Sequence, residues 1–322
     1  MGQVTKRLKR FIKDSVQRMI GITEVQERLE NLQKGLSDPT SWSRILNDVA
    51  CANQAVQQQL SRSYRTSLHP QVPLPSLLDA EFRCFSQNGE DGILLYLFSL
   101  IGTTNKRVVE ICAGNGIECN AANLIVNQGW IGLLVDGSAE KLAVGKQFYA
   151  NCRDTFFYRP TLLASWITAE NVNALVADNG FAGEIDLLSL DLDGMDYWVL
   201  KALTCIRPRA IILEVNTRWG PERAVTLPYR PDFTMDWNRH PWCGGASLPA
   251  FVNLGRERGY RLVGTNRQGM NALFLRADVG ADVFPEISAL EAYRRCPYLR
   301  HWSPDSLPSP ADRPEWWDVV EV

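Results

Sequence analysis

The chain has 322 residues, 45% of them hydrophobic and 22% charged, with a formal net charge of −2. This is the composition of an ordinary globular protein, and the near balance of acids and bases excludes a strongly basic nucleic-acid-binding domain. The eight cysteines form no C-x-x-C pair, so their spacing predicts neither a zinc site nor a small disulfide scaffold. Without a visible secretory signal or an apolar run of about 18 residues, we expect a cytoplasmic protein.

The first 36 residues predict helices with two possible uses. Residues 1–20 carry six basic residues and one acid, and their apolar residues fall near one helical face. Such a helix can lie on the anionic inner face of a membrane, or it can pack against its own domain or a partner. Apolar residues then recur at alternating spacings of three and four over residues 22–36, a short coiled-coil-like seam suited to a hairpin or a homo-oligomer contact. A second helix is expected over residues 42–63.

Composition also predicts the domain boundaries. A proline-rich stretch separates an N-terminal helical extension, residues 1–68, from the rest of the chain, so residues 69–80 are interpreted as a linker. The main domain is expected over residues 81–285. Residues 286–322 form a tail rich in Trp and Pro, which is expected either to strap across the domain or to contact a partner.

The main domain alternates between helical segments and nearly continuous apolar strands. Helices are expected near residues 86–102, 120–129, 139–150, 168–180, 196–205 and 245–260, and strands near residues 107–112, 130–138, 155–160, 185–194 and 209–216. Such alternation predicts an α/β fold with a mostly parallel sheet and helices on both faces. A β-hairpin over residues 261–278 closes the pattern, so the last strand is expected to run antiparallel, as in the Rossmann-like sheet of class I methyltransferases.

A glycine turn follows the first predicted strand. Gly114 and Gly116 are spaced as G-x-G, but Cys119 stands where a dinucleotide fingerprint has its third glycine. Glu110 precedes the turn, and Asp136 follows Gly116 by twenty residues, the separation expected of a carboxylate that binds ribose hydroxyls.

A carboxylate beside this turn would repel a pyrophosphate but attract an ammonium group. S-Adenosylmethionine has an ammonium group and a ribose but no phosphate, so it fits Glu110 and Asp136 together. The alternative is a generic strand-to-helix turn without a ligand. Cys112 occupies the first glycine position of the acid-x-Gly-x-Gly-x-Gly pattern of this class, and a positive φ would be costly there.

Acidic side chains gather at the predicted ends of the fourth and fifth strands. Asp191, Asp193 and Asp196 follow one strand, and Glu214 and Asn216 end the next. Asp191 and Asp193 point to the same side because side chains alternate along a strand. The cluster could supply a general base or orient an acceptor, or it could bind Mg²⁺, to which we do not commit. The third alternative is purely structural, with Asp196 capping the next helix.

Several stretches in order resemble the FkbM-like class I methyltransferases of bacteria. They are SQNGEDGIL, VEICAGNGIECNAANLI, GWIGLLVDGS, IDLLSLDLDGMDYWVLKAL and GASLPAFVNLGRERGYRLVGTNRQGMNALFLR, which together cover about residues 80–280. The resemblance implies methyl transfer from S-adenosylmethionine to an oxygen of a small molecule, sugar or glycan. It does not extend to the N-terminal helices or the tail.

Three further residues complete the predicted site. Gln87 is expected near the methionine end of the cofactor, unless its stretch only caps the next helix through Ser86 or Asn88. Trp166 is expected to border the adenine. His240 is a candidate general base in an aromatic-rich segment, residues 217–245, that could close over the site or simply pack on itself.

The leading hypothesis is therefore an S-adenosylmethionine-dependent O-methyltransferase acting on a sugar, glycan or secondary metabolite. A non-catalytic, methyltransferase-like scaffold held by the N-terminal helices is the alternative, favoured by the apolar seam at residues 22–36 and by Cys112. A nicotinamide-dependent oxidoreductase is disfavoured by Cys119.

Overall fold

The computed structural model describes residues 39–67, 74–235, 244–306 and 318–322. The predicted basic helix, the apolar seam and His240 lie outside these residues. The chain divides into two compact units, Met1–Gln59 and Leu60–Val322. Helix α2 (Pro39–Thr66) crosses this boundary and confirms the helix predicted over residues 42–63. None of the described helices is long and apolar enough to cross a membrane.

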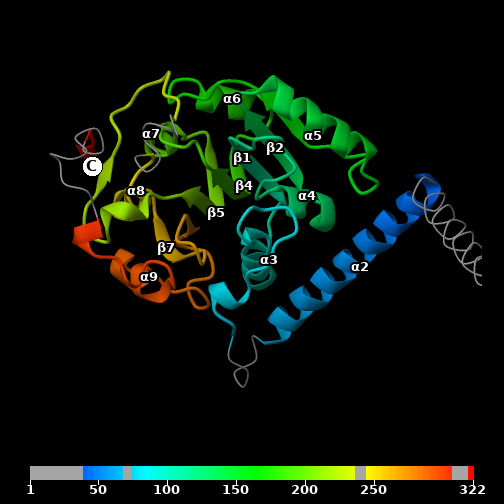
Figure 1. The fold of residues 1–322 in the computed structure, drawn as a ribbon, viewed down its shortest axis with the longest axis horizontal. Helices are drawn as coiled ribbons and strands as arrows, with labels where there is room; N and C mark the ends of the chain where they lie inside the picture. The colour runs from blue at the N-terminus through cyan, green and yellow to red at the C-terminus, as the bar shows by residue number, and fades with distance from the viewer. Residues whose placement is uncertain (1–38, 68–73, 236–243, 307–317) are drawn as a thin grey trace, which may run out of the picture. The chain divides into compact units, whose positions relative to one another are not determined.

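A seven-stranded sheet with the order β3-β2-β1-β4-β5-β8-β7 organises the second unit (Figure 1). Its strands are β1 (Arg107–Ile111), β2 (Ile131–Asp136), β3 (Thr161–Ala164), β4 (Gly183–Leu190), β5 (Ile206–Glu214), β7 (Tyr260–Thr265) and β8 (Asn271–Arg276). Strands β1 to β5 are parallel, and β8 runs antiparallel to both β5 and β7. The predicted class I methyltransferase fold, with its closing hairpin, is confirmed.

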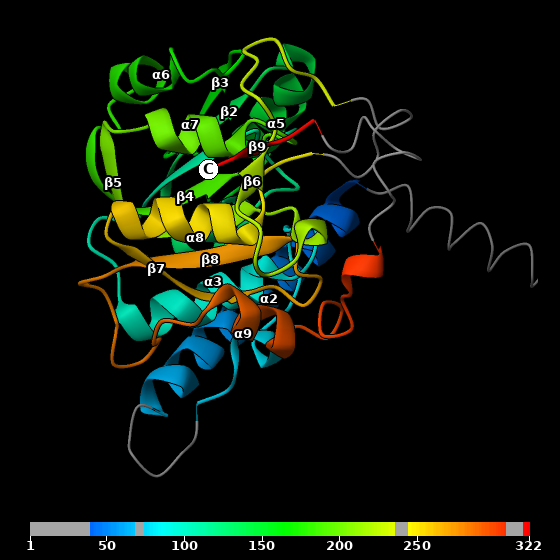
Figure 2. The same cartoon turned by 90° about the vertical axis from the view of Figure 1, so that its left-hand side faces the viewer.

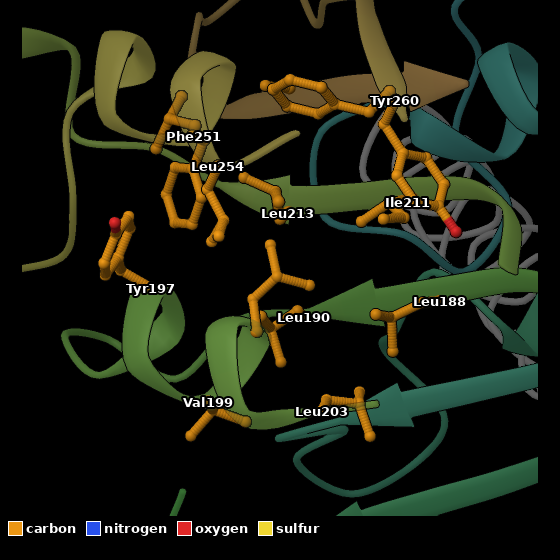
Figure 3. Packing of buried hydrophobic residues seen from close by; sticks show 14 of the residues in the cluster. Leu188, Leu190, Tyr197, Val199, Leu203, Ile211, Leu213, Phe251, Leu254 and Tyr260 are labelled. Carbon is orange, nitrogen blue, oxygen red and sulfur yellow. The ribbon is translucent and has the colours of Figure 1, made fainter. Parts of the chain in front are cut away.

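Helices cover both faces of the sheet, as the continuous apolar strands require. One buried cluster includes residues of α3 (Glu90–Ile101), α4 (Ala122–Gln128) and α5 (Ala139–Asn151). The other includes residues of α6 (Val172–Asp178), α7 (Asp196–Ala202), α8 (Leu248–Glu257) and α9 (Ala289–Arg295). Figure 3 shows this second cluster, in which Leu190 and Leu213 face side chains from α7 and α8. Adjacent residues such as Val108 and Val109 of β1 belong to opposite clusters, so both faces of the strand are covered and its apolar residues do not alternate with polar ones.

The third predicted strand is wrong in its position. The sequence favoured residues 155–160, but β3 begins at Thr161 and pairs with Leu133–Asp136 of β2. The aromatic run was read as a strand because aromatic residues are enriched in strands. Phe157 and Tyr158 instead lie in the loop before β3, with 84% and 86% of their surfaces exposed.

The C-terminal part adds elements that the sequence pattern did not predict. A two-stranded ribbon pairs β6 (Val225–Thr226) with β9 (Val320–Glu321), as Figure 2 shows. Trp302 donates its indole N–H to the carbonyl of Arg218, 2.9 Å away, within the short helix η2 (Thr217–Trp219). Two further short helices are η1 (Leu77–Asp79) and η3 (Pro304–Ser306). The end of the tail therefore packs across the segment that follows β5.

Candidate active site at the carboxyl edge of the sheet

Strands β2 and β3 are added on one side of β1, and β4 and β5 on the other. The strand order therefore reverses between β1 and β4, and a crevice is expected outside the carboxyl ends of these two strands. The glycine turn lies there. Cys112, Gly114 and Gly116 have φ values of +62°, +58° and +71°. The positive φ predicted to be costly at Cys112 is therefore present, and it costs on the order of 1–2 kcal/mol for a residue other than glycine.

Asp136 joins the glycine turn to the end of β2. One carboxylate oxygen accepts the Gly114 N–H at 2.8 Å, and the other accepts the Ser138 N–H at 2.8 Å. Each oxygen retains a second lone pair. No atom lies within 4 Å of where a Cβ on Gly114 would be, so the turn faces open space. Asp136 was predicted from its position twenty residues after Gly116, and in the structure it contacts the glycine turn directly.

Glu110 has a different environment from the one predicted. It is buried, and its two oxygens accept hydrogen bonds from the N–H groups of Asn120 and Ala121 and from the hydroxyl of Ser189. Burial raises the pKa of the Glu110 carboxyl, and these hydrogen bonds oppose the rise. The side chain fixes the start of α4 beside β1, which favours a positioning role over direct contact with an ammonium group.

A carboxylate cluster lies at the tips of β4 and β5. Oxygens of Asp191, Asp193 and Glu214 lie within 4.8 Å of one another. Burial and the charges of Asp196 and Asp193 raise the pKa of Asp191 to about 7. Burial and the neighbouring acids also raise the pKa of Glu214, and its side chain shares a hydrogen bond with Asp191. Two carboxyl groups this close share a proton rather than both ionising.

Asp196 and Asn216 hold the backbone around this cluster. Asp196 is fully buried and accepts the N–H groups of Leu192 and Gly194 at 2.7 and 3.0 Å, so its structural interpretation is favoured. Asn216 accepts the N–H of Arg218 and donates to the carbonyl of Gly244. These hydrogen bonds place Asn216 in the scaffold of the site.

Trp166 lies beside the residue that follows Asp136, whereas Gln87 lies on the loop before α3. A Cβ on Gly137, the residue after Asp136, would lie 3.2 Å from the Trp166 ring, and the indole N–H donates to Pro231. Gln87 is exposed on the loop before α3. The N-cap residue of α3 is Gly89, but the Ser86 hydroxyl accepts the N–H of Asp91 in the first turn of the helix at 3.1 Å, which supports the capping alternative through Ser86.

Two residues at this edge were not identified from the sequence. Lys141, in the first turn of α5, is close enough to Asp193 to oppose the burial that raises the pKa of that carboxyl. A basic residue five positions after Asp136 was the available signal. Phe233 contacts Gly194, where a Cβ would lie 2.3 Å from the ring. The aromatic-rich segment 217–245 was expected near the site, but its sequence did not single out Phe233 as the ring beside Gly194.

An apolar cavity of about 490 Å³ lies elsewhere in the second unit. It is lined by residues of the segment 74–78, of β7 and of α9, and it holds none of the predicted site residues. Its lining includes Tyr96, Arg295 and Cys296 but no carboxylate or histidine. The carboxyl edge therefore remains the candidate site.

Comparisons with known proteins found distant structural matches only. No family model matches the chain, and no curated protein matches it in sequence. The glycopeptide N-methyltransferase MtfA, complexed with S-adenosylhomocysteine, is 13% identical over 62% of this chain and 93% of its own, with a TM-score of 0.37. The methyltransferase domain of bacterial CtHen1 is 14% identical over 58% and 96%, with a TM-score of 0.37. TnmH is 14% identical over 80% and 69%, with a TM-score of 0.36. Likeness at this level carries no conclusion about function, and the fold assignment rests on the strand order.

Proposed function

We propose that this chain is an S-adenosylmethionine-dependent O-methyltransferase whose site is the carboxyl edge of β1, β2, β4 and β5. The observation that carries the proposal is the contact between Asp136 and the glycine turn, with open space above Gly114. Asp136 would accept the ribose hydroxyls through its remaining lone pairs. Trp166, beside Gly137, would border the adenine, and Gln87 the methionine end.

Glu110 supports this binding indirectly in the proposal. Its hydrogen bonds to Asn120 and Ala121 hold the end of the turn against β1. An apolar replacement such as Ala would leave the N–H groups of Asn120 and Ala121 without this acceptor, which is costly. We therefore assign Glu110 a positioning role, with the electrostatic attraction of an ammonium group as a secondary effect.

S-Adenosylmethionine supplies an already activated methyl group on a sulfonium. The protein then needs to align the acceptor, exclude water and accept a proton. When that methyl group is transferred to an acceptor hydroxyl, S-adenosylhomocysteine would leave, and a carboxylate of this chain would accept the hydroxyl proton. The pair Asp191–Glu214, which holds one proton between two carboxyl groups, can accept it near neutral pH.

The acceptor is proposed to be a hydroxyl of a sugar, a glycan or a secondary metabolite. Carboxylates bind hydroxyl groups as hydrogen-bond acceptors, and Asp193 lies beside the pair in a position to orient a second hydroxyl. The FkbM-like resemblance favours the same class of acceptor. The aromatic ring of Phe233, in contact with Gly194, would offer an apolar surface to a sugar ring.

Mg²⁺ binding is a second candidate role for the cluster. Asp191, Asp193 and Glu214 provide oxygen ligands of the type that Mg²⁺ prefers, within 4.8 Å of one another. Calorimetry with MgCl₂ on the wild type and on Asp193→Asn distinguishes the two roles. Heat of binding that the substitution abolishes favours the cation, and no heat in either protein favours the carboxylate base.

Calorimetry with S-adenosylhomocysteine tests the proposed cofactor site. The intact protein should bind, and Asp136→Ala should weaken binding by roughly 10- to 100-fold, the effect of losing hydrogen bonds to a charged acceptor. Asp178→Ala is the matched control, because Asp178 is an exposed carboxylate on α6, and it should bind like the wild type. Circular dichroism checks that each variant is folded. Absence of binding by the folded wild type would contradict the proposal.

A further inference from the structure

The loop between α5 and β3 (Figure 1) carries an apolar surface that the proposed site does not use. Phe156, Phe157 and Tyr158 are consecutive, and 52%, 84% and 86% of their surfaces are exposed. Single exposed apolar residues are common, but a contiguous aromatic patch marks an interaction surface.

The loop is anchored from inside, so the aromatic side chains are held outward by structure. Thr155 is buried and donates its hydroxyl to the carbonyl of Tyr149 at 2.8 Å. Phe156 and Phe157 pack edge to face, with their ring centroids 5.2 Å apart. The Arg159 guanidinium lies 5.5 Å from the Phe156 ring centroid. These contacts order the base of the loop and leave its tip to solvent.

The chemistry of the tip fits an anionic phospholipid surface. Aromatic side chains are enriched where the headgroups of a bilayer meet its acyl chains, and basic residues nearby attract anionic lipids. Arg153 and Arg159 flank the three aromatic residues, with Asp154 as the single acid between them. We propose that the loop over residues 152–160 inserts its aromatic tip into an anionic membrane surface.

The predicted basic amphipathic helix at residues 1–20 offers a second, independent attachment. One weak signal gives only marginal and reversible membrane binding, whereas two together give stable attachment.

The position of the loop has a consequence for the site. The loop precedes β3, so it lies at the amino edge of the parallel sheet, and the carboxylate cluster lies at the opposite edge. Insertion of the loop therefore leaves the crevice at the carboxyl edge open to acceptors from the aqueous side. The proposal does not depend on the reaction catalysed there.

Vesicle sedimentation of the full chain tests the proposal. Wild-type protein should sediment with vesicles of phosphatidylcholine mixed with phosphatidylglycerol, less with phosphatidylcholine alone, and less as salt rises. The double variant Phe157→Ser/Tyr158→Ser should lower partitioning roughly tenfold. Tyr298→Ser is the matched control, since Tyr298 is an exposed aromatic residue, 69% accessible, elsewhere in the unit.

Hydrogen exchange on the unmodified protein locates the contact. Anionic vesicles should slow amide exchange over residues 153–159. Equal partitioning of the wild type and the double variant, or unchanged exchange in the loop, would overturn the proposal and leave any membrane binding to the N-terminal segment. A wild-type dimer in sedimentation velocity that the double variant loses would assign the patch to a second copy instead, which also overturns it.

Discussion

The two ends of β4 and β5 carry acidic side chains in opposite electrostatic settings. Near the amino ends, Asp186 of β4 is fully buried and pairs with Arg209 of β5 at 2.8 Å. It also accepts the N–H groups of Thr104, Asn105 and Lys106. At the carboxyl ends of the same strands, Asp191 and Glu214 face each other and share a hydrogen bond.

The difference in electrostatic setting distinguishes a structural carboxylate, Asp186, from the carboxylates of the candidate site. Burial alone would raise the pKa of the Asp186 carboxyl, but Arg209 and the three amides outweigh it, and the pKa is lowered. None of the three clustered carboxylates forms a salt bridge within the described residues. Evolution tolerates unpaired, crowded acids mainly where they perform chemistry. This contrast supports placing the proposed reaction at the carboxyl edge of these strands.

The largest expected effect is on stability at the amino edge. Arg209→Met should lower the free energy of unfolding by about 3–5 kcal/mol, because the charge of Asp186 stays buried without its partner. Urea denaturation measures the change. Arg256→Met is the control: it breaks the solvent-exposed pair with Glu286, which should cost below about 1 kcal/mol.

The stability lost in Arg209→Met should depend on pH, which tests the ion pair at the amino edge more closely. Because the folded pKa of Asp186 is lowered, its stabilisation is present above the unfolded value of about 3.9 and is lost as pH falls through the folded pKa. The gap between the wild type and Arg209→Met should therefore narrow in acid. A gap that is the same at all pH values would contradict the ion-pair account.

At the carboxyl edge we expect the opposite pH dependence of the free energy of unfolding. The raised pKa of Asp191, about 7, means that the folded protein binds a proton more tightly than the unfolded chain does. Stability should therefore fall as pH rises from about 4 to about 7. Asp191→Asn should remove this penalty and stabilise the protein at pH 8 by roughly 0.5–1 kcal/mol. The carboxyl group is desolvated by its neighbours, but the residue as a whole is exposed, so water screens much of the repulsion.

Carbon-13 NMR titration of the carboxyl groups checks the assignment directly. A signal that titrates near neutral pH should disappear in Asp191→Asn and move to lower pH in Asp193→Asn, which removes a neighbouring charge. If every resolved carboxyl titrates below about pH 5, the shared proton does not exist.

An effect of similar size is expected at the glycine turn. Cys112→Gly should be more stable than Cys112→Ala by about 1 kcal/mol, because glycine adopts φ = +62° without strain and alanine does not. Thermal denaturation of the two variants measures the difference, and both lose the thiol, so packing losses nearly cancel. Greater stability of the alanine variant would show that the turn relaxes when the side chain changes.

Continuous apolar runs in the sequence predicted most of the strands, because helices cover both faces of the sheet and bury side chains on each. Continuous apolar runs placed β1, β2, β4 and β5, and the acids that end them were correctly expected at one edge. Sequence spacing could not reveal that Glu110 binds the start of α4, because a carboxylate looks the same whether it accepts ligand or backbone hydrogen bonds. Contacts such as that of Phe233 with Gly194 depend on chain folding over long separations.

Hydrogen exchange with and without S-adenosylhomocysteine tests the central claim most directly. The account predicts that the ligand slows exchange at the glycine turn, residues 113–118, and at the turn after β2, residues 137–141, where Asp136 holds both. Slowed exchange confined to the apolar cavity, at residues 74–78 and 263–265, or no change anywhere in the chain, would contradict it.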